Sequence, residues 1–221
     1  MSDQSSRRRS GGRAARRAAR SEATQEAVPF LTRSMTPVEV VSEEGLAAIE
    51  DNAETILEEV GIDFREYPRA LELLGSAGAQ VDGERVRFPR GMCREIIEAS
   101  APSTYTHHAR NPARSVQVGG DATVFAPAYG PPFVHDLDDG RRYATIEDFN
   151  NFVKLAYQSP HLHLSGGTVC EPVDIPVSKR HLDMVYAHLR YSDKPFMGSV
   201  TAAERAQDTV DMAKLVFGDE F

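Results

Sequence analysis

The second half of the chain repeats one pattern, an extended apolar run followed by a helix, and this repeat constrains the fold more than any other feature. Such runs start near residues 122, 161 and 195, at intervals of 39 and 34 residues. Strands that alternate with helices in this way form parallel sheets. The intervals are close to the roughly 31 residues per unit of a (β/α)₈ barrel. The sequence therefore predicts an α/β fold of the TIM-barrel class.

The distance from residue 122 to the C-terminus leaves room for about three βα units rather than eight. We therefore expect a TIM barrel truncated to about three units and preceded by an α-helical and hairpin cap. The expected regions are a disordered basic leader over 1–27, the cap over 28–121 and the incomplete barrel over 122–221. Capping residues and breakers predict helices over 42–61, 68–76 and 89–102, from Thr145 onward, and over 178–190 and 201–218. A hairpin is predicted over 79–88, and strands are predicted over 104–108 and 115–118.

Charge is distributed unevenly along the chain, and this bears on possible partners. The net charge is −8, but residues 1–20 hold seven Arg and one acid, so the remaining 201 residues carry −14. An acidic body argues against nucleic acid as a partner, and the lack of a run of about 18 apolar residues argues against a membrane span. Two distant cysteines without a secretory signal favour the cytoplasm. The leader has three interpretations: a basic arm, a transit-like peptide, or a disordered segment without a catalytic role.

The segment 126–142, APAYGPPFVHDLDDGRR, follows the first predicted barrel strand. Its Pro and Gly content predicts a loop without helix or regular sheet. Loops at the C-terminal ends of barrel strands carry the active sites of TIM-barrel enzymes. The aromatic, imidazole and carboxylate groups of this loop are therefore candidates for a functional site: Tyr129, Phe133, His135 and Asp136.

Three segments resemble one known family. They are GLAAIEDNAETILEEVGIDF at 45–64, VQVGGDATVFAPAYGPPFVHDLDDGRRYATIEDF at 116–149, and VCEPVDIPVSKRHLDMVYAHLRYSDKPF at 169–196. Together they resemble the trimethylamine methyltransferase (MttB-like) family of corrinoid-dependent methyltransferases. The resemblance implies a TIM barrel that moves a methyl group from an amine to the cobalt of a separate corrinoid protein. Members that use trimethylamine carry pyrrolysine, and relatives without it act on quaternary amines such as glycine betaine. The position of pyrrolysine or its replacement lies in the part of the barrel beyond residue 221.

The resemblance also implies what the site must bind. The chain itself is expected to bind no cofactor or metal, because the methyl acceptor is cobalamin on the corrinoid protein. A quaternary ammonium donates no hydrogen bond, so aromatic faces and carboxylates suit it, and each cation–π contact contributes ~0.5–2 kcal/mol. Tyr129, Phe133, His135 and Asp136 supply these groups and are the predicted substrate-binding residues, while no catalytic residue is assigned. A full-length protein of this kind is expected to be a homo-oligomer.

Two other functions are compatible with the sequence. His161 and His163 alternate on a predicted strand and could bind metal in a TIM-barrel hydrolase. However, His161 follows Pro160 at the start of that strand, the end away from the usual site, so structural roles are favoured. The third possibility is a non-catalytic fragment, because a three-strand parallel sheet exposes apolar faces and unpaired edges and is expected to aggregate. Among the other reactive groups, the amides of 165–167 are candidates for anion binding, Cys170 is expected to be packed, and His181 and His188 are expected to cover the barrel exterior.

Overall fold

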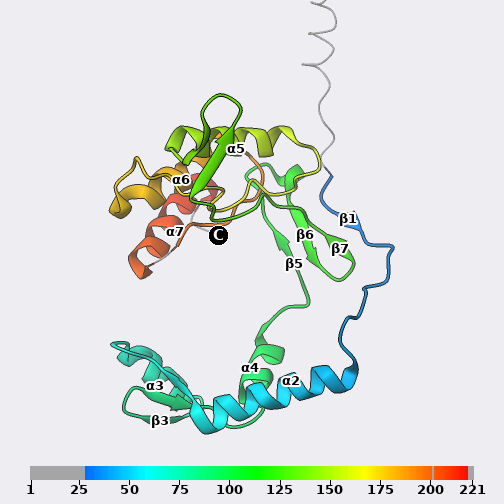
Figure 1. Ribbon diagram of the computed structural model, residues 1–221, viewed down its shortest axis with the longest axis vertical. Helices are drawn as coiled ribbons and strands as arrows, with labels where there is room; N and C mark the ends of the chain where they lie inside the picture. The colour runs from blue at the N-terminus through cyan, green and yellow to red at the C-terminus, as the bar shows by residue number, and fades with distance from the viewer. Residues whose placement is uncertain (1–27, 201, 219–221) are drawn as a thin grey trace, which may run out of the picture. The chain divides into compact units, whose positions relative to one another are not determined.

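The computed structural model describes residues 28–200 and 202–218, which form two compact units of mixed α/β structure (Figure 1). One unit is Ser34–Ser103, and the described part of the other combines residues 28–33 with residues 104–200 and 202–218. The boundary between compact units therefore falls at Ser103, whereas the cap was predicted to extend to residue 121. No closed barrel forms among the described residues, and none of their helices is long and apolar enough to cross a membrane. The predicted leader over 1–27 and the predicted cap residue Thr201 lie outside the described residues.

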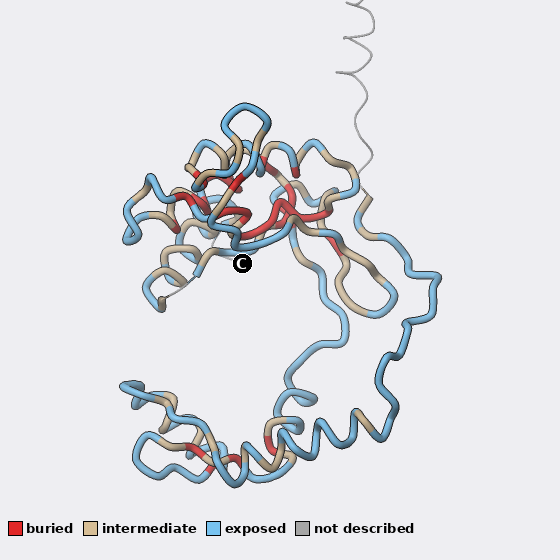
Figure 2. The backbone as a smooth tube through the Cα atoms, viewed as in Figure 1, coloured by how far each residue is buried: buried red, intermediate tan, exposed pale blue. Residues whose placement is uncertain are grey.

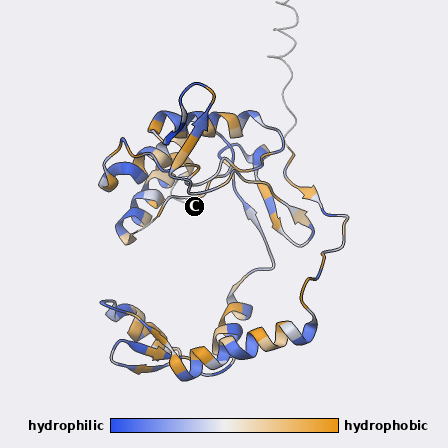
Figure 3. Cartoon of the chain, viewed as in Figure 1, coloured by the Kyte–Doolittle hydropathy of each residue, from blue (hydrophilic) through white to orange (hydrophobic). Residues whose placement is uncertain are grey.

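The smaller unit begins with the helix that its capping residues predict. Ser42 accepts a hydrogen bond from the Gly45 amide, and α2 runs over Glu43–Thr55 before a π-helical turn, Ile56–Val60. Gly61 ends this helix with φ +76°, a conformation that favours glycine. Polar and apolar residues alternate along α2 (Figure 3). Within the unit its predicted apolar residues stay largely exposed, namely Leu46, Ile49, Ile56 and Val60.

The rest of this unit is a small antiparallel sheet packed with two short helices. Helix α3, Pro68–Ser76, starts at a proline in its first turn, and α4 covers Met92–Ser100. The sheet order is β2-β4-β3, with β2 at Ile62–Asp63, β3 at Gln80–Asp82 and β4 at Arg85–Arg87. Both helices and the hairpin over 79–88 are confirmed. A compact core of four buried residues holds the unit together: Ala79, Val86, Phe88 and Met92.

The larger unit contains a four-stranded antiparallel sheet in the order β1-β7-β6-β5. Its strands are β1 Leu31–Thr32, β5 Thr104–His107, β6 Val116–Gly119 and β7 Ala122–Thr123. The predicted strands over 104–108 and 115–118 are therefore confirmed. The predicted parallel barrel strand at 122–126 is not, because β7 is only two residues long and pairs antiparallel with β6 and β1. Gly119 and Gly120, both with positive φ, reverse the chain there and produce a hairpin.

Three helices follow, and the first two of them contribute to the main core. They are α5 Ile146–Gln158, α6 Val177–Tyr191 and α7 Ala203–Phe217, with α6 packed against both α5 and α7. The buried backbone of the chain concentrates in this unit (Figure 2). The core combines residues from the hairpin of β8, Phe133–Asp136, and β9, Gly140–Tyr143, from the residue after it, from α5, from α6 and from the connection between these two helices. These residues are Val134, Ala144, Phe149, Val153, Val169, Cys170, Met184 and Ala187.

The predicted second and third barrel strands lie side by side in parallel, but they do not form a regular ladder. Gly166 and Phe196 make an isolated parallel bridge, with the Met197 amide donating to the Gly166 carbonyl at 2.8 Å. The His163 amide donates to the Phe125 carbonyl at 2.9 Å, which places the first run beside the second. Gly166 has φ +104°, so the extended conformation stops at this residue. The three runs thus follow the predicted order without forming the predicted strands.

Candidate functional site

The segment 126–142 is not an irregular loop throughout, which corrects the prediction from its Pro and Gly content. Its second half forms a hairpin of β8, Phe133–Asp136, and β9, Gly140–Tyr143. The alternation of the β8 side chains explains the hairpin, because Val134 enters the core while Phe133 and His135 share the other face. Gly140, with φ +67°, completes the turn. The prolines affect only the first half of the segment.

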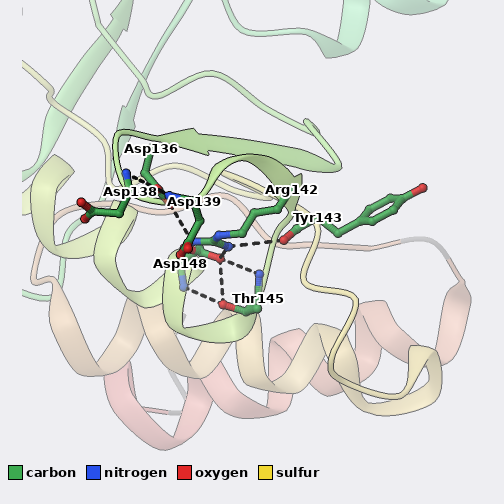
Figure 4. Close-up of polar contacts among 7 residues, drawn as sticks. All are labelled: Asp136, Asp138, Asp139, Arg142, Tyr143, Thr145 and Asp148. Atoms are coloured by element: carbon green, nitrogen blue, oxygen red, sulfur yellow. Dashed lines mark hydrogen bonds and ion pairs between the residues drawn. The ribbon is translucent and has the colours of Figure 1, made fainter.

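A charged network fixes this hairpin to the start of α5 (Figure 4). Arg142 donates to both carboxylate oxygens of Asp148, at 2.6 and 2.8 Å, and to Asp136 at 3.0 Å. Asp148 also accepts from the Thr145 amide and hydroxyl at 2.8 Å, which completes the predicted capping box. The Arg142 guanidinium lowers the pKa of Asp148 well below its ordinary 3.8, against the opposing effect of burial. A two-oxygen ion pair of this kind holds one geometry better than a single contact does.

Two of the four predicted substrate-binding residues have structural partners within the hairpin. Asp136 accepts from the amides of Asp139 and Asp138, at 2.7 and 3.0 Å, as well as from Arg142, and these bonds lower the pKa of its carboxyl. The Phe133 ring lies 4.6 Å from the Tyr143 ring and 3.7 Å from the Arg141 guanidinium carbon. Phe133 therefore already contacts one cation, the guanidinium of Arg141 on the neighbouring strand β9. Asp136 and Phe133 therefore both stabilise the hairpin.

Tyr129 and His135 are the more accessible members of the predicted set. His135 is exposed on β8, and Tyr129 keeps 46% of its surface exposed. The Tyr129 hydroxyl donates to the Met197 sulfur at 2.7 Å, and its ring lies so close to Gly167 that a Cβ there would be 3.1 Å away. Partial burial raises the pKa of the Tyr129 hydroxyl. Tyr129 thus stands between the segments that follow the second and third predicted strands, while His135 lies on the hairpin.

His188, which was predicted to cover the barrel exterior, is buried beneath the turn 165–167. Its Nε2–H donates to the Gly167 carbonyl at 2.8 Å, so its Nδ1 accepts from the Ser165 hydroxyl at 2.5 Å. The imidazole stacks on Phe196 with 9° between the ring planes. Burial lowers the pKa of His188 to about 4, although the hydrogen bond to Gly167 opposes this. The neutral ring therefore holds the turn in place.

Lys194 is a second buried side chain that holds neighbouring segments in place through hydrogen bonds. It is 5% exposed, and its ammonium donates to the carbonyls of Ala156, Ser159 and Leu162 at 2.7–2.8 Å. Burial lowers the pKa of Lys194 to about 8. These three bonds use all three ammonium protons. They tie the end of α5 and the second predicted strand to the start of the third.

A cavity of about 340 Å³ lies where α6 and α7 begin, and we call it the α6–α7 cavity. His181, which was also predicted to cover the barrel exterior, lines this cavity and is 5% exposed. Its Nε2 lies 2.7 Å from the Asp208 carboxylate on α7. Arg180 also lines the cavity and forms an ion pair with Glu171 at 2.5 Å. The lining residues are Gly130, Thr168, Glu171, Val177, Arg180, His181, Met184, Ser199 and Arg205.

A second cavity of about 340 Å³ is apolar and lies between the hairpin and α5. Of the four predicted residues, only Phe133 lines this cavity. The α6–α7 cavity is lined by Gly130, the residue after Tyr129, and by none of the four. The structure therefore does not gather the four predicted residues around one pocket. The side chains that line the second cavity are all hydrocarbon: Pro127, Ala128, Pro131, Phe133, Phe152, Leu155, Ala156, Leu162 and Val169.

The other candidates from the sequence have structural surroundings. His163 is buried, and its Nδ1 accepts from the Phe125 amide at 2.8 Å, whereas His161 is exposed. Among residues 28–200 and 202–218, no group of three or more His, Cys, Asp or Glu side chains is placed to hold a metal. Cys170 is fully buried, as expected for a packed thiol, and burial raises its pKa to about 12. These surroundings do not favour the metal-dependent hydrolase.

Sequence reasoning missed the residues that position these segments. The signal for His181 and His188 was present, because Met184, Val185 and Ala187 lie between them and mark a buried helix face. Lys194 and Arg142 gave no comparable signal, because their partners are distant carbonyls or a side chain six positions away on another element. Their roles depend on tertiary contacts.

Two comparisons with known proteins bear on this arrangement. The model of the family described as trimethylamine methyltransferase (MTTB) matches residues 9–221. The chain is also 47% identical over 182 residues to a protein described as glycine betaine methyltransferase from Desulfitobacterium hafniense (strain Y51). That alignment covers 81% of this chain and 37% of the relative. The chain therefore spans well under half of that relative's length.

Proposed function

The chain belongs to the trimethylamine methyltransferase family, and from that membership we propose that it is part of an enzyme that demethylates a quaternary amine. Glycine betaine is the first candidate substrate. The observation that carries this proposal is the 47% identity to a glycine betaine methyltransferase over 81% of the chain. The hydrogen bond between His163 and Phe125 and the parallel bridge between Gly166 and Phe196 support the further proposal that these segments belong to a TIM barrel.

The proposed reaction is a displacement at carbon. The C–N bond of the quaternary ammonium breaks, its electron pair stays on nitrogen, and the amine leaves neutral, so no proton donor is needed at nitrogen. We propose cobalt in its +1 state, held by a separate corrinoid protein, as the acceptor that supplies the electron pair for the new carbon–cobalt bond. The task of this chain is then to bind the cation, orient one methyl group and exclude water.

The residues of the segment 126–142 suit such a task to different degrees. Tyr129 offers a half-exposed ring beside the turn 165–167, and His135 offers an exposed ring on the hairpin. We propose these two as the substrate-binding residues of first rank. Phe133 and Asp136 remain in the proposed set as the residues that shape the hairpin, because their own contacts are largely made within it. Cation–π binding at Tyr129 would contribute ~0.5–2 kcal/mol.

Methyl transfer can be tested directly with methyl-labelled glycine betaine. The chain is incubated with this substrate and reduced cobalamin, with and without a corrinoid protein, and dimethylglycine is measured by mass spectrometry. The proposal predicts labelled methylcobalamin and dimethylglycine in equal amounts, with choline and trimethylamine as comparison substrates. Label that stays in glycine betaine under every condition would contradict it. Homo-oligomerisation, which we propose for a full-length protein of this kind, is measured by sedimentation.

A further inference from the structure

We infer that Met197 and Gly167 are positioning residues for Tyr129, and that they hold its aromatic ring in the orientation in which it binds a quaternary ammonium group. This inference rests on the proposed function, because it concerns the residue that we propose as a ligand of the cation. It goes further by naming two residues, on two other segments of the chain, that fix the ring without contacting the substrate themselves.

The Tyr129 side chain is held at its hydroxyl end. Its hydroxyl donates to the Met197 sulfur at 2.7 Å, and partial burial raises the pKa of this hydroxyl. Tyrosine has only two side-chain torsions, so a hydrogen bond at the far end of the side chain restricts both of them. The ring is therefore held in one orientation, although Tyr129 stays about half exposed.

Gly167 contributes through its lack of a side chain rather than through its backbone conformation, because its φ lies outside the left-handed region. A Cβ at this position would lie 3.1 Å from Cε1 of Tyr129 and 3.3 Å from the Met197 carbonyl oxygen. Carbon atoms in contact are normally about 3.5–4.0 Å apart. Glycine thus allows the Tyr129 ring to lie directly against the turn 165–167, and a side chain here would displace the ring.

Hydrogen bonds between backbones join the three segments that carry these residues. The amide of Gly130, which follows the tyrosine, donates to the Thr168 carbonyl at 2.7 Å. The Met197 amide donates to the Gly166 carbonyl at 2.8 Å. The turn 165–167 is therefore fixed to the segment before it and to the segment after it, on either side of the contact with the ring.

His188 supports the same contact from the core. It is buried, and its Nε2–H donates to the Gly167 carbonyl at 2.8 Å. Its ring also stacks against Phe196, the residue before Met197, with the ring centroids 5.7 Å apart. One buried side chain thus holds the backbone at Gly167 and next to Met197. The orientation of the exposed ring consequently depends on contacts within the core.

A ring that is already oriented binds a cation more tightly than a ring that must be ordered on binding. Cation–π attraction requires the cation to lie over the face of the ring, so it depends on the ring's orientation. Releasing Tyr129 from Met197 should therefore weaken the binding of a quaternary ammonium about two- to tenfold, the loss that corresponds to ordering one side chain. The ring itself stays present in such a variant.

The contact is tested first without any ligand, by nuclear magnetic resonance of the chain with ¹³Cζ-labelled tyrosine. The chain has seven tyrosines, and Tyr129→Phe identifies the Tyr129 signal by deleting it. Met197→Leu keeps the approximate volume of the side chain and removes the acceptor, so it should shift this signal, as should Gly167→Ala. Met35→Leu, which changes an exposed methionine, is the matched control and should leave the signal in place. A Tyr129 signal that stays unshifted in Met197→Leu overturns the inference.

Binding is then measured by calorimetry with tetramethylammonium chloride, which carries the quaternary ammonium group alone, and with glycine betaine. The chains compared are the unsubstituted chain, Met197→Leu, Tyr129→Phe and the double substitution. Each single substitution should weaken both ligands about two- to tenfold. The double substitution should weaken them no more than the larger single loss, because Met197 acts through the Tyr129 hydroxyl.

Two outcomes separate this inference from the proposed function. Unchanged affinity in Met197→Leu, or losses that add in the double substitution, overturn the inference and leave the proposed substrate standing. A lack of saturable binding by the unsubstituted chain contradicts the proposed function, and with it the role of the two residues in binding the cation. Met197→Leu changes a partly exposed side chain, so the comparison does not depend on a substitution in the core.

Discussion

Acid should destabilise the larger unit through one buried side chain, His188. Burial lowers the pKa of this imidazole from 6.5 to about 4 in the folded chain. In the unfolded chain the ring titrates near its ordinary pKa, so the unfolded state takes up the proton first as the pH falls. The stability due to the neutral ring is fully present above about pH 6.5 and is lost progressively down to about pH 4. At 1.36 kcal/mol per pKa unit this loss is roughly 3 kcal/mol.

The assay is urea unfolding followed by circular dichroism at a series of pH values, for the unsubstituted chain and for His188→Gln. The substitution lowers stability at every pH, because the Ser165 hydroxyl and the Gly167 carbonyl lose their partner. The informative quantity is the slope against pH, which should be shallower for His188→Gln by roughly 3 kcal/mol across the window. His161→Gln, which removes an exposed histidine, should keep the original slope. Parallel slopes for His188→Gln and the unsubstituted chain would refute the assignment of a buried neutral ring.

Three further predictions concern the contacts that position the segments around the site. Asp148→Asn should lower the free energy of unfolding by ~1–2 kcal/mol at neutral pH, a value discounted for the partial exposure of Arg142. Because the lowered pKa of Asp148 stabilises only its ionised form, the substitution should also remove the part of the acid-induced loss of stability that occurs below about pH 4. An equal loss of stability at low and at neutral pH would contradict this. Lys194→Met should cost ~2–4 kcal/mol in urea unfolding, because three carbonyls lose their donor, and a neutral effect would show that water replaces the ammonium. Gly166→Ala should lower the melting temperature more than Gly140→Ala, because both have positive φ but only at Gly166 would a Cβ lie 2.7 Å from Val169; equal shifts would contradict the packing argument.

The elements that could be predicted from the sequence are those whose cause is local. Ser42 caps α2, and Thr145 with Asp148 caps α5, because a capping residue acts on amides two or three positions away. Pro68 starts α3 for the same kind of reason. Each of these helices begins where its capping residue or proline predicts.

The elements that could not be predicted depend on contacts distant in the chain. The hairpin β8–β9 had a local signal, since apolar and polar residues alternate over 133–136 before the turn at Gly140, but the neighbouring prolines outweighed it in the prediction. The predicted barrel strands required pairing across about thirty residues or more, and the described residues show only an isolated parallel bridge there, between Gly166 and Phe196. At the site, the contact between Tyr129 and Met197 and the burial of His181 against Asp208 each join separate elements. Periodicity along a single element does not report such contacts.

Calorimetric titration of glycine betaine tests the central claim most directly, namely that this chain binds a quaternary amine at the segment 126–142. The unsubstituted chain is compared with Tyr129→Ala and His135→Ala. The account predicts saturable binding that Tyr129→Ala weakens about tenfold, the loss of one desolvated cation–π contact, and that His135→Ala also weakens. Equal affinity for all three chains, or no binding by the unsubstituted chain, would contradict it.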